Sequence, residues 1–163
     1  GAARPLLKWE EAKTIPWDVL LLFGGGLSLA AGMEASGLTA RLAGSLAVLG
    51  GLPRPLIYLA LATLVVALSE LASNTAVAAL MMPLVASLGG ATGIPPLELI
   101  VVTGLAASLG FALPVATPPN AIAFGSGFVP VRTMFRTGIV LDLIGIVVVV
   151  ALAAVLIPLV LDG

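Results

Sequence analysis

Three long runs without a single charged residue limit what this chain can fold into. They extend over residues 71–97, 99–131 and 143–161. A helix that crosses the hydrocarbon core of a bilayer needs about 20 predominantly apolar residues. The whole chain is 60% hydrophobic and only 9% charged, with a mean hydropathy of +1.23, whereas a soluble domain typically carries about 25% charged residues. The sequence therefore predicts an all-α polytopic membrane protein.

The composition also excludes several classes of function. The net charge of −1 argues against a nucleic-acid partner, which would need a basic patch. The chain has no cysteine and no histidine, which rules out disulfides, thiolate or imidazole metal sites and the usual nucleophilic triads. We therefore expect a protein that is not an enzyme and that uses no organic cofactor.

The N-terminal third contains one predicted span and one predicted surface helix. Residues 1–16 are of mixed charge and form an expected interfacial lead-in, because Trp9 and Trp17 are placed like the aromatic residues that mark a membrane surface. The first span is predicted over residues 17–33. Leucines recur at helical spacing in residues 37–54, which predicts an amphipathic arm lying at the interface.

The stretch SELASNTAVAALMMP, at residues 69–83, inserts polar side chains between two apolar segments. A straight helix over residues 55–88 would be about 51 Å long at a rise of 1.5 Å per residue, whereas the hydrocarbon core is only about 30 Å thick. Ser73-Asn74-Thr75 is the expected break, because Ser and Asn are strong N-cap residues. This favours a re-entrant helical hairpin over residues 55–88, although two complete spans also fit.

Residues 97–128 present the same problem and include the sequence ALPVATPPNAIAFGSG. Three prolines within six residues cannot all lie inside one continuous helix, since each removes a backbone donor. We predict a helix that ends near Pro114, an unwound Val115-Ala116 and a new short helix capped by Thr117, with Pro118 at the favoured first position. A last span is expected over residues 138–161.

Both breaks place a fresh helix N-terminus inside an apolar run. Such a terminus has free N–H groups and a partial positive charge of roughly half an electron, which makes it an anion site. The carbonyl groups just before the breaks, around Ser69, Ala72 and Ala116, are suitable oxygen ligands for sodium, which is a hard cation. Discontinuous helices of this kind are the sequence pattern of a secondary transporter.

Structural explanations compete with this interpretation. Ser and Thr in membrane helices are usually packing residues that bond to their own helix, and residues 117–120 could form a kink without a ligand. Glu70 is a functional candidate, as intramembrane acids are, but it could equally be a buried acceptor that ties the hairpin tip to neighbouring helices. Asp142 is interpreted as a structural residue near the interface.

The motif SELASNTA at residues 69–76, followed by ATPPNAIAFGSG at residues 116–127, resembles the divalent anion/sodium symporter family, the di- and tricarboxylate/sodium transporters. The upstream sequence IPWDVLLLFGGGLSLA, at residues 15–30, is similar too. The likeness runs over essentially the whole chain but covers only the C-terminal part of that family's chain. Because Gly1 is not preceded by an initiator methionine, we also expect a sequence cut from a longer protein.

The resemblance implies part of an inverted-repeat transporter in the plasma (inner) membrane. Residues 17–54 would supply a scaffold-type helix and the arm, and residues 55–163 would be part of a transport domain that moves like an elevator against a dimeric scaffold. The missing N-terminal half, with its own Ser-Asn-Thr hairpin, a second copy in a homodimer and membrane lipid are the implied partners.

By the same resemblance, a sodium site would lie at four positions, where the family often has Thr in place of the first: Ser69, Ala72, Asn74 and Ala116. Carboxylate contacts of the substrate would come from Ser73, Asn74, Thr75, Thr117 and Pro118. The implied function couples sodium influx, as a co-transported ion, to uptake of a di- or tricarboxylate such as succinate. Alternatives are transport of another oxyanion (sulfate or arsenite) or a truncated, non-transporting membrane module.

Overall fold

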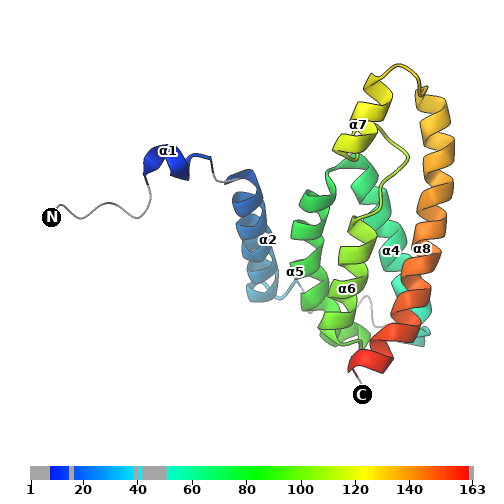
Figure 1. Cartoon of the computed structure of the whole chain (residues 1–163). Helices are drawn as coiled ribbons and strands as arrows, with labels where there is room; N and C mark the ends of the chain where they lie inside the picture. Colours follow the sequence, from blue (N-terminus) through cyan, green and yellow to red (C-terminus); the bar gives the residue numbers. More distant parts are fainter. Residues whose placement is uncertain (1–7, 15–16, 39–40, 42–50, 162–163) are drawn as a thin grey trace.

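The computed structural model describes residues 8–14, 17–38, 41 and 51–161, and within these ranges all regular structure is helical. The predicted arm at residues 37–54 falls mostly outside the described residues. Figure 1 shows a bundle whose helices run roughly along one direction. The elements are α1 (Trp9–Ala12), α2 (Trp17–Ala35), α4 (Arg54–Leu71), α5 (Asn74–Thr92), α6 (Pro96–Ala107), α7 (Pro118–Gly125) and α8 (Val131–Leu161).

The predicted break at Ser73-Asn74-Thr75 is confirmed. Helix α4 ends at Leu71, and Ala72 is extended, with φ −140° and ψ 164°. Ser73 then caps α5, because its hydroxyl accepts a hydrogen bond from the Ala76 N–H at 3.2 Å. A side-chain acceptor thus satisfies one of the four N–H groups that every helix start leaves open.

The second break is longer than predicted. Helix α6 ends at Ala107 rather than near Pro114, so the unwound segment extends from Ser108 to Ala116. The physical reason is that the backbone N–H groups of residues 111–113 bond to side-chain carboxylates instead of to preceding carbonyl groups. Thr117 caps α7 as predicted, since its hydroxyl accepts from the Asn120 N–H at 3.3 Å.

The last helix also differs from the prediction. Helix α8 begins at Val131 rather than at residue 138, directly after Pro130. The prediction counted only the apolar part of the segment, whereas Arg132 and Arg136 lie on the exposed side of the same helix. Two helical stretches, Arg54–Leu71 and Val131–Ile157, are long and apolar enough to cross a membrane.

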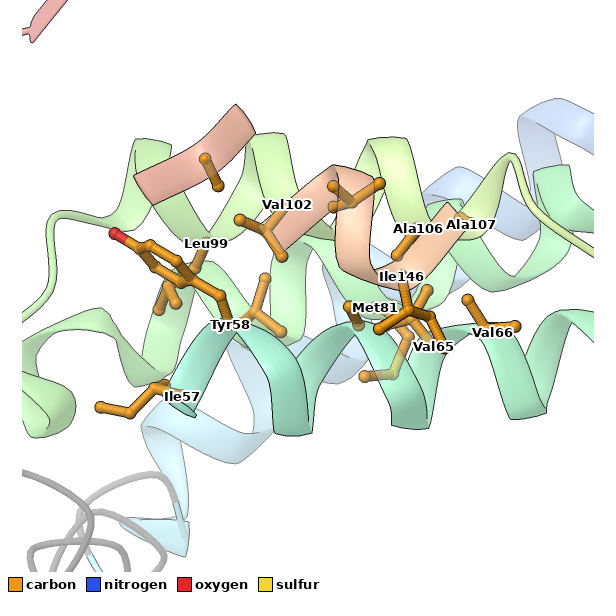
Figure 2. Close-up of a cluster of buried hydrophobic side chains, with 14 of the residues drawn as sticks. Ile57, Tyr58, Val65, Val66, Met81, Leu99, Val102, Ala106, Ala107 and Ile146 are labelled. Carbon is orange, nitrogen blue, oxygen red and sulfur yellow. The ribbon is translucent and has the colours of Figure 1, made fainter. Parts of the chain in front are cut away.

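Four helices build the hydrophobic core. Figure 2 shows side chains of α4, α5, α6 and α8 that meet between the ribbons, among them Tyr58, Met81, Val102 and Ile146. The buried positions along α4 follow the helical period, so one face of the helix is buried along its length: Ile57, Tyr58, Ala62, Val65, Val66 and Ser69. Helix α2 contacts this bundle through α5.

A buried carboxylate joins α4 and α6 at the end of the bundle away from the breaks. Glu98, in the first turn of α6, is 1% exposed. It accepts hydrogen bonds from the Tyr58 hydroxyl and from Arg54 Nη1, the latter at 3.2 Å. Both donors belong to the first part of α4, so the two helices are fixed to each other where they begin.

Close approach of α8 to the unwound segment depends on glycine. A Cβ added at Gly138 would lie 2.2 Å from the Phe111 carbonyl oxygen and 2.3 Å from Ala112 Cα. About two turns further along α8, a Cβ added at Gly145 would lie 2.8 Å from Leu109 Cδ1. The backbone of α8 therefore packs directly on the backbone of residues 111–112.

This contact predicts a strong effect of Gly138→Ala. The methyl group would displace backbone rather than a flexible side chain, so we expect the free energy of unfolding to fall by about 1–3 kcal/mol, the range of overpacking. Thermal unfolding in detergent checks this against Gly24→Ala, since Gly24 is also helical but has no atom within 4 Å of an added Cβ. Equal midpoints for the two variants would contradict the packing described.

Candidate functional site

An unpartnered oxygen marks the start of α5. Asn74 is the first residue of that helix, and its Oδ1 atom is buried without a hydrogen-bond partner. In the part of the chain that the structure describes, the Thr103 hydroxyl is the other buried side-chain oxygen in this condition. Thr103 lies within the continuous helix α6, whereas Asn74 stands at a break. A buried acceptor without a partner is unfavourable by roughly 1–3 kcal/mol, so a donor or a cation beside this oxygen would be stabilising.

Gly110, in the unwound segment, lies against this oxygen. A Cβ added there would be 3.2 Å from Asn74 Oδ1, 3.6 Å from the Ser69 carbonyl oxygen and 3.6 Å from Ala116 Cβ. Atoms of Ser69, Asn74 and Ala116 thus lie within 4 Å of a single point. The backbone angle φ of +139° at Gly110 further restricts this position to glycine.

Three polar side chains hold the unwound segment in place. Glu70 accepts from the Ala112 and Leu113 N–H groups, both at 2.7 Å, and Asp142 accepts from the Phe111 N–H at 3.2 Å. Asn120 Nδ2 donates to the carbonyl oxygens of Gly110 and Leu113, both at 2.9 Å. The Ser69 hydroxyl adds a long contact of 3.4 Å to the Ala107 carbonyl. The backbone groups freed by unwinding are thereby paired inside the protein, as an apolar surrounding demands.

The two helix starts lie at the same end of the bundle. In Figure 1, α7 sits at the end where α4 passes into α5. Thr117, the cap of α7, follows directly on Ala116, which is 1% exposed and lines the space beside Gly110. Neutral oxygens such as Asn74 Oδ1 and the Ser69 carbonyl can ligate a small hard cation, and a helix N-terminus next to them can bind an anion.

The predicted site residues are only partly brought together. Ser69, Asn74 and Ala116 meet around Gly110. The remaining predicted residues are Ala72, Ser73, Thr75 and Pro118, which are exposed, and Thr117, which is half-buried. Among the described residues no hydrogen bond joins Ser73 or Thr75 to the second break.

Sequence reasoning missed Gly110 and the contact of Asp142 with the unwound segment. A glycine in the stretch SLGFALP could have signalled an end of the helix, since glycine interrupts helices. Asp142, expected near the interface, is 5% exposed and faces the unwound segment from α8. No sequence pattern could have paired it with Phe111, 31 positions away. The structure favours the structural alternative for Glu70, because both of its oxygens are used by backbone N–H groups.

Discontinuous helices with a buried, unpartnered oxygen at a break are typical of membrane transporters. The described residues also include two helices of membrane length. Comparison with known proteins is more specific. The family described as the sodium:sulfate symporter transmembrane region matches residues 3–161. The chain therefore belongs to this family of sodium-coupled anion symporters and is an integral protein of the plasma membrane.

Two relatives are named sodium-dependent dicarboxylate transporter SdcS. The protein of Staphylococcus saprophyticus is 42% identical over 153 residues, which cover 94% of this chain and 30% of the relative. The protein of Staphylococcus aureus strain MRSA252 is 41% identical over 158 residues, which cover 97% and 30%. The chain thus spans about 30% of the length of these curated relatives.

The contacts of Asn120 predict that Asn120→Asp destabilises the fold more than Asn120→Ala does. The alanine leaves two carbonyl oxygens without a donor, at roughly 1–3 kcal/mol for each buried group, whereas the aspartate adds a negative oxygen facing them at about the 2.9 Å of the present contacts. Thermal unfolding measures the order. Ser87→Ala is the control, since that hydroxyl bonds only to Leu84 of its own helix. An aspartate variant as stable as wild type would refute the contacts assigned to Asn120.

Proposed function

We propose that this chain is the C-terminal part of a secondary active transporter that couples sodium influx to uptake of a dicarboxylate such as succinate. The observation that carries the proposal is the buried, unpartnered Oδ1 of Asn74 beside the Ser69 carbonyl oxygen and Gly110. The names of the SdcS relatives, which state sodium-dependent dicarboxylate transport, support it.

Sodium is proposed to bind beside the two helix breaks, on the side that faces the interior of the bundle. Asn74 Oδ1 and the carbonyl oxygens of Ser69, Ala72 and Ala116 would ligate the ion. The geometry supports two of the four, since Asn74 Oδ1 and the Ser69 carbonyl oxygen lie near one point beside Gly110, whereas the Ala116 atom near that point is its Cβ. Neutral amide and carbonyl oxygens suit a transported ion, because a hard monovalent cation is bound without the multiple carboxylates of a permanent divalent site.

The substrate carboxylates are proposed to lie at the starts of α5 and α7. Ser73, Asn74 and Thr75 would bind one carboxylate, and Thr117 and Pro118 the other. The N–H groups and partial positive charge at the start of α5 favour an anion without any basic residue. At the start of α7, Pro118 and Pro119 have no N–H and the Asn120 N–H bonds to Thr117, so the partial positive charge of the helix and the Thr117 hydroxyl would act there. Their exposure leaves Ser73, Thr75 and Pro118 accessible to a solute.

Asn74 would link the two ligands, because its side chain belongs to both sites. Sodium would order the junction of α4 and α5 and so create the anion site, while the anion would in turn raise the affinity for sodium. Such reciprocity is required of any thermodynamic coupling between two sites. Transport of the anion alone would be unfavourable by the free energy needed to order the junction.

The rest of the proposed transporter would cover apolar surface near the breaks. Several large side chains there are strongly exposed, namely Leu71 (74%), Val115 (73%), Ile122 (74%) and Phe128 (90%). Residues 55–88 would form the re-entrant hairpin of a transport domain at residues 55–163, and residues 17–54 part of the scaffold. An N-terminal half with inverted topology would face the exposed side chains, and two full-length copies would form an elevator-type homodimer.

Asn74→Ala is expected to abolish sodium-dependent uptake of labelled succinate, since it removes a ligand from both proposed sites. The measurement uses the complete reading frame that contains this chain, reconstituted into proteoliposomes with an inward sodium gradient. Thr63→Ala serves as the control, because the Thr63 hydroxyl bonds only to Leu59 of its own helix. Near-normal uptake by the Asn74 variant would count against the assignment.

Sulfate is the second candidate substrate, favoured by the description of the family. Fluxes of labelled succinate, citrate and sulfate, with sodium or with choline, separate the possibilities. The proposal expects sodium-dependent uptake of succinate that excess unlabelled sulfate does not inhibit. Sodium-dependent uptake of sulfate alone would support the second candidate, and no sodium-dependent flux of any anion would refute both.

A further inference from the structure

The carboxylates of Glu70 and Asp142 have no part in the proposed ligand sites. They nevertheless accept hydrogen bonds from the unwound segment that lies next to those sites. Three consecutive backbone N–H groups, of residues 111–113, all point to one or the other of these two side chains. A carboxylate is an acceptor with room for several donors, and its bonds to N–H groups are short and charge-assisted. The distances of 2.7 Å from Glu70 are at the short end for such bonds.

The two carboxylates reach the segment from different helices. Glu70 is the last but one residue of α4, directly after Ser69, and Asp142 belongs to α8. Both bond to backbone N–H groups of the residues that directly follow Gly110. Glu70, which is adjacent to Ser69 in α4, therefore fixes the position of the segment relative to Ser69. Asp142 and the backbone contact at Gly138 fix its position relative to α8.

The consequence concerns the surroundings of Asn74 Oδ1. An added Cβ at Gly110 would be 3.2 Å from this oxygen, so the backbone of the segment packs directly beside it and a shift of the segment would change the atoms that face it. The number and placement of coordinating oxygens affect which ion a site binds.

We propose that Glu70 and Asp142 are positioning residues that hold Gly110 against Asn74 and so set the surroundings of Asn74 Oδ1 in the proposed sodium site without ligating the ion. This rests on the proposed function. The positioning role extends the proposed function, because it assigns ion affinity and selectivity to two carboxylates whose oxygens bond to the backbone of the unwound segment.

Glu70→Gln tests the assignment, because it keeps the shape of the side chain but presents an amide NH₂ where one backbone N–H now donates. In proteoliposomes, we expect the sodium concentration for half-maximal succinate uptake to rise on the order of tenfold, the effect of losing one charge-assisted hydrogen bond. Saturating sodium should restore most of the maximal rate. The preference for sodium over lithium should weaken, which a merely destabilised fold would not produce.

Glu98→Gln is the matched control. Glu98 is also a buried carboxylate with two hydrogen-bond donors, but it lies at the other end of α4 and α6. We expect lower thermal stability and an unchanged sodium requirement. A rise in the sodium requirement as large as that of Glu70→Gln would overturn the inference, since the effect would then follow from the loss of any buried carboxylate.

A second readout separates this inference from the proposed function. In detergent, sodium should raise the unfolding temperature of the wild-type protein relative to choline, because a ligand stabilises the state that binds it. Glu70→Gln should reduce this increase even where no succinate is transported. A sodium requirement and sodium stabilisation within twofold of wild type overturn the inference, while wild-type protein without sodium-dependent uptake overturns only the proposed function.

Asp142→Asn provides the decision if Glu70→Gln yields no folded protein. The Asp142 bond to Phe111 is longer, at 3.2 Å, than the Glu70 bonds, at 2.7 Å, so a smaller rise of about threefold in the sodium requirement is expected. A sodium requirement equal to that of the wild type in this folded variant overturns the inference.

Discussion

The pairing of the Glu70 carboxylate with the Ala112 and Leu113 N–H groups is the interaction on which the second helix break depends. An unwound backbone among apolar helices would leave donors unpaired, which is strongly unfavourable in a membrane. One side chain at the end of α4 removes that penalty for two residues, and Asp142 removes it for a third. The break in one helix is thus stabilised by side chains of two others, so the site is a property of the packed bundle.

Packing and polar contacts divide the bundle into two ends with different roles. At one end Glu98, Tyr58 and Arg54 join the beginnings of α4 and α6. Tyr58 also belongs to the core of mainly aliphatic side chains (Figure 2). At the other end the helices stop, and oxygen atoms of Ser69 and Asn74 converge on Gly110. A rigid base beneath an interrupted end is suited to a site in which a small change of distance alters which ion is bound.

Local chemistry made much of this predictable. Ser73 and Thr117 were expected to cap new helices, and both do so through a hydroxyl that accepts from the N–H three residues later. Capping is encoded within four residues, so the sequence is sufficient to locate it. The end of α6 was placed wrongly, because the segment after it is held by bonds to distant carboxylates. The start of α8 was placed wrongly because the prediction counted only the apolar part of that helix.

The sequence by itself determined that the chain is a bundle of apolar helices interrupted at Ser73 and Thr117, since hydropathy, proline and capping residues act over one or two turns. Only the tertiary structure decided how far the second break extends and which atoms face Asn74. The contacts of the glycine at 110 with the junction of α4 and α5, of the glycine at 138 with Phe111, and of the acids at 70 and 142 join residues that are 27 to 43 positions apart in the sequence. The role of these residues therefore depends on the close approach of backbone segments that are distant in the sequence, which no local pattern predicts.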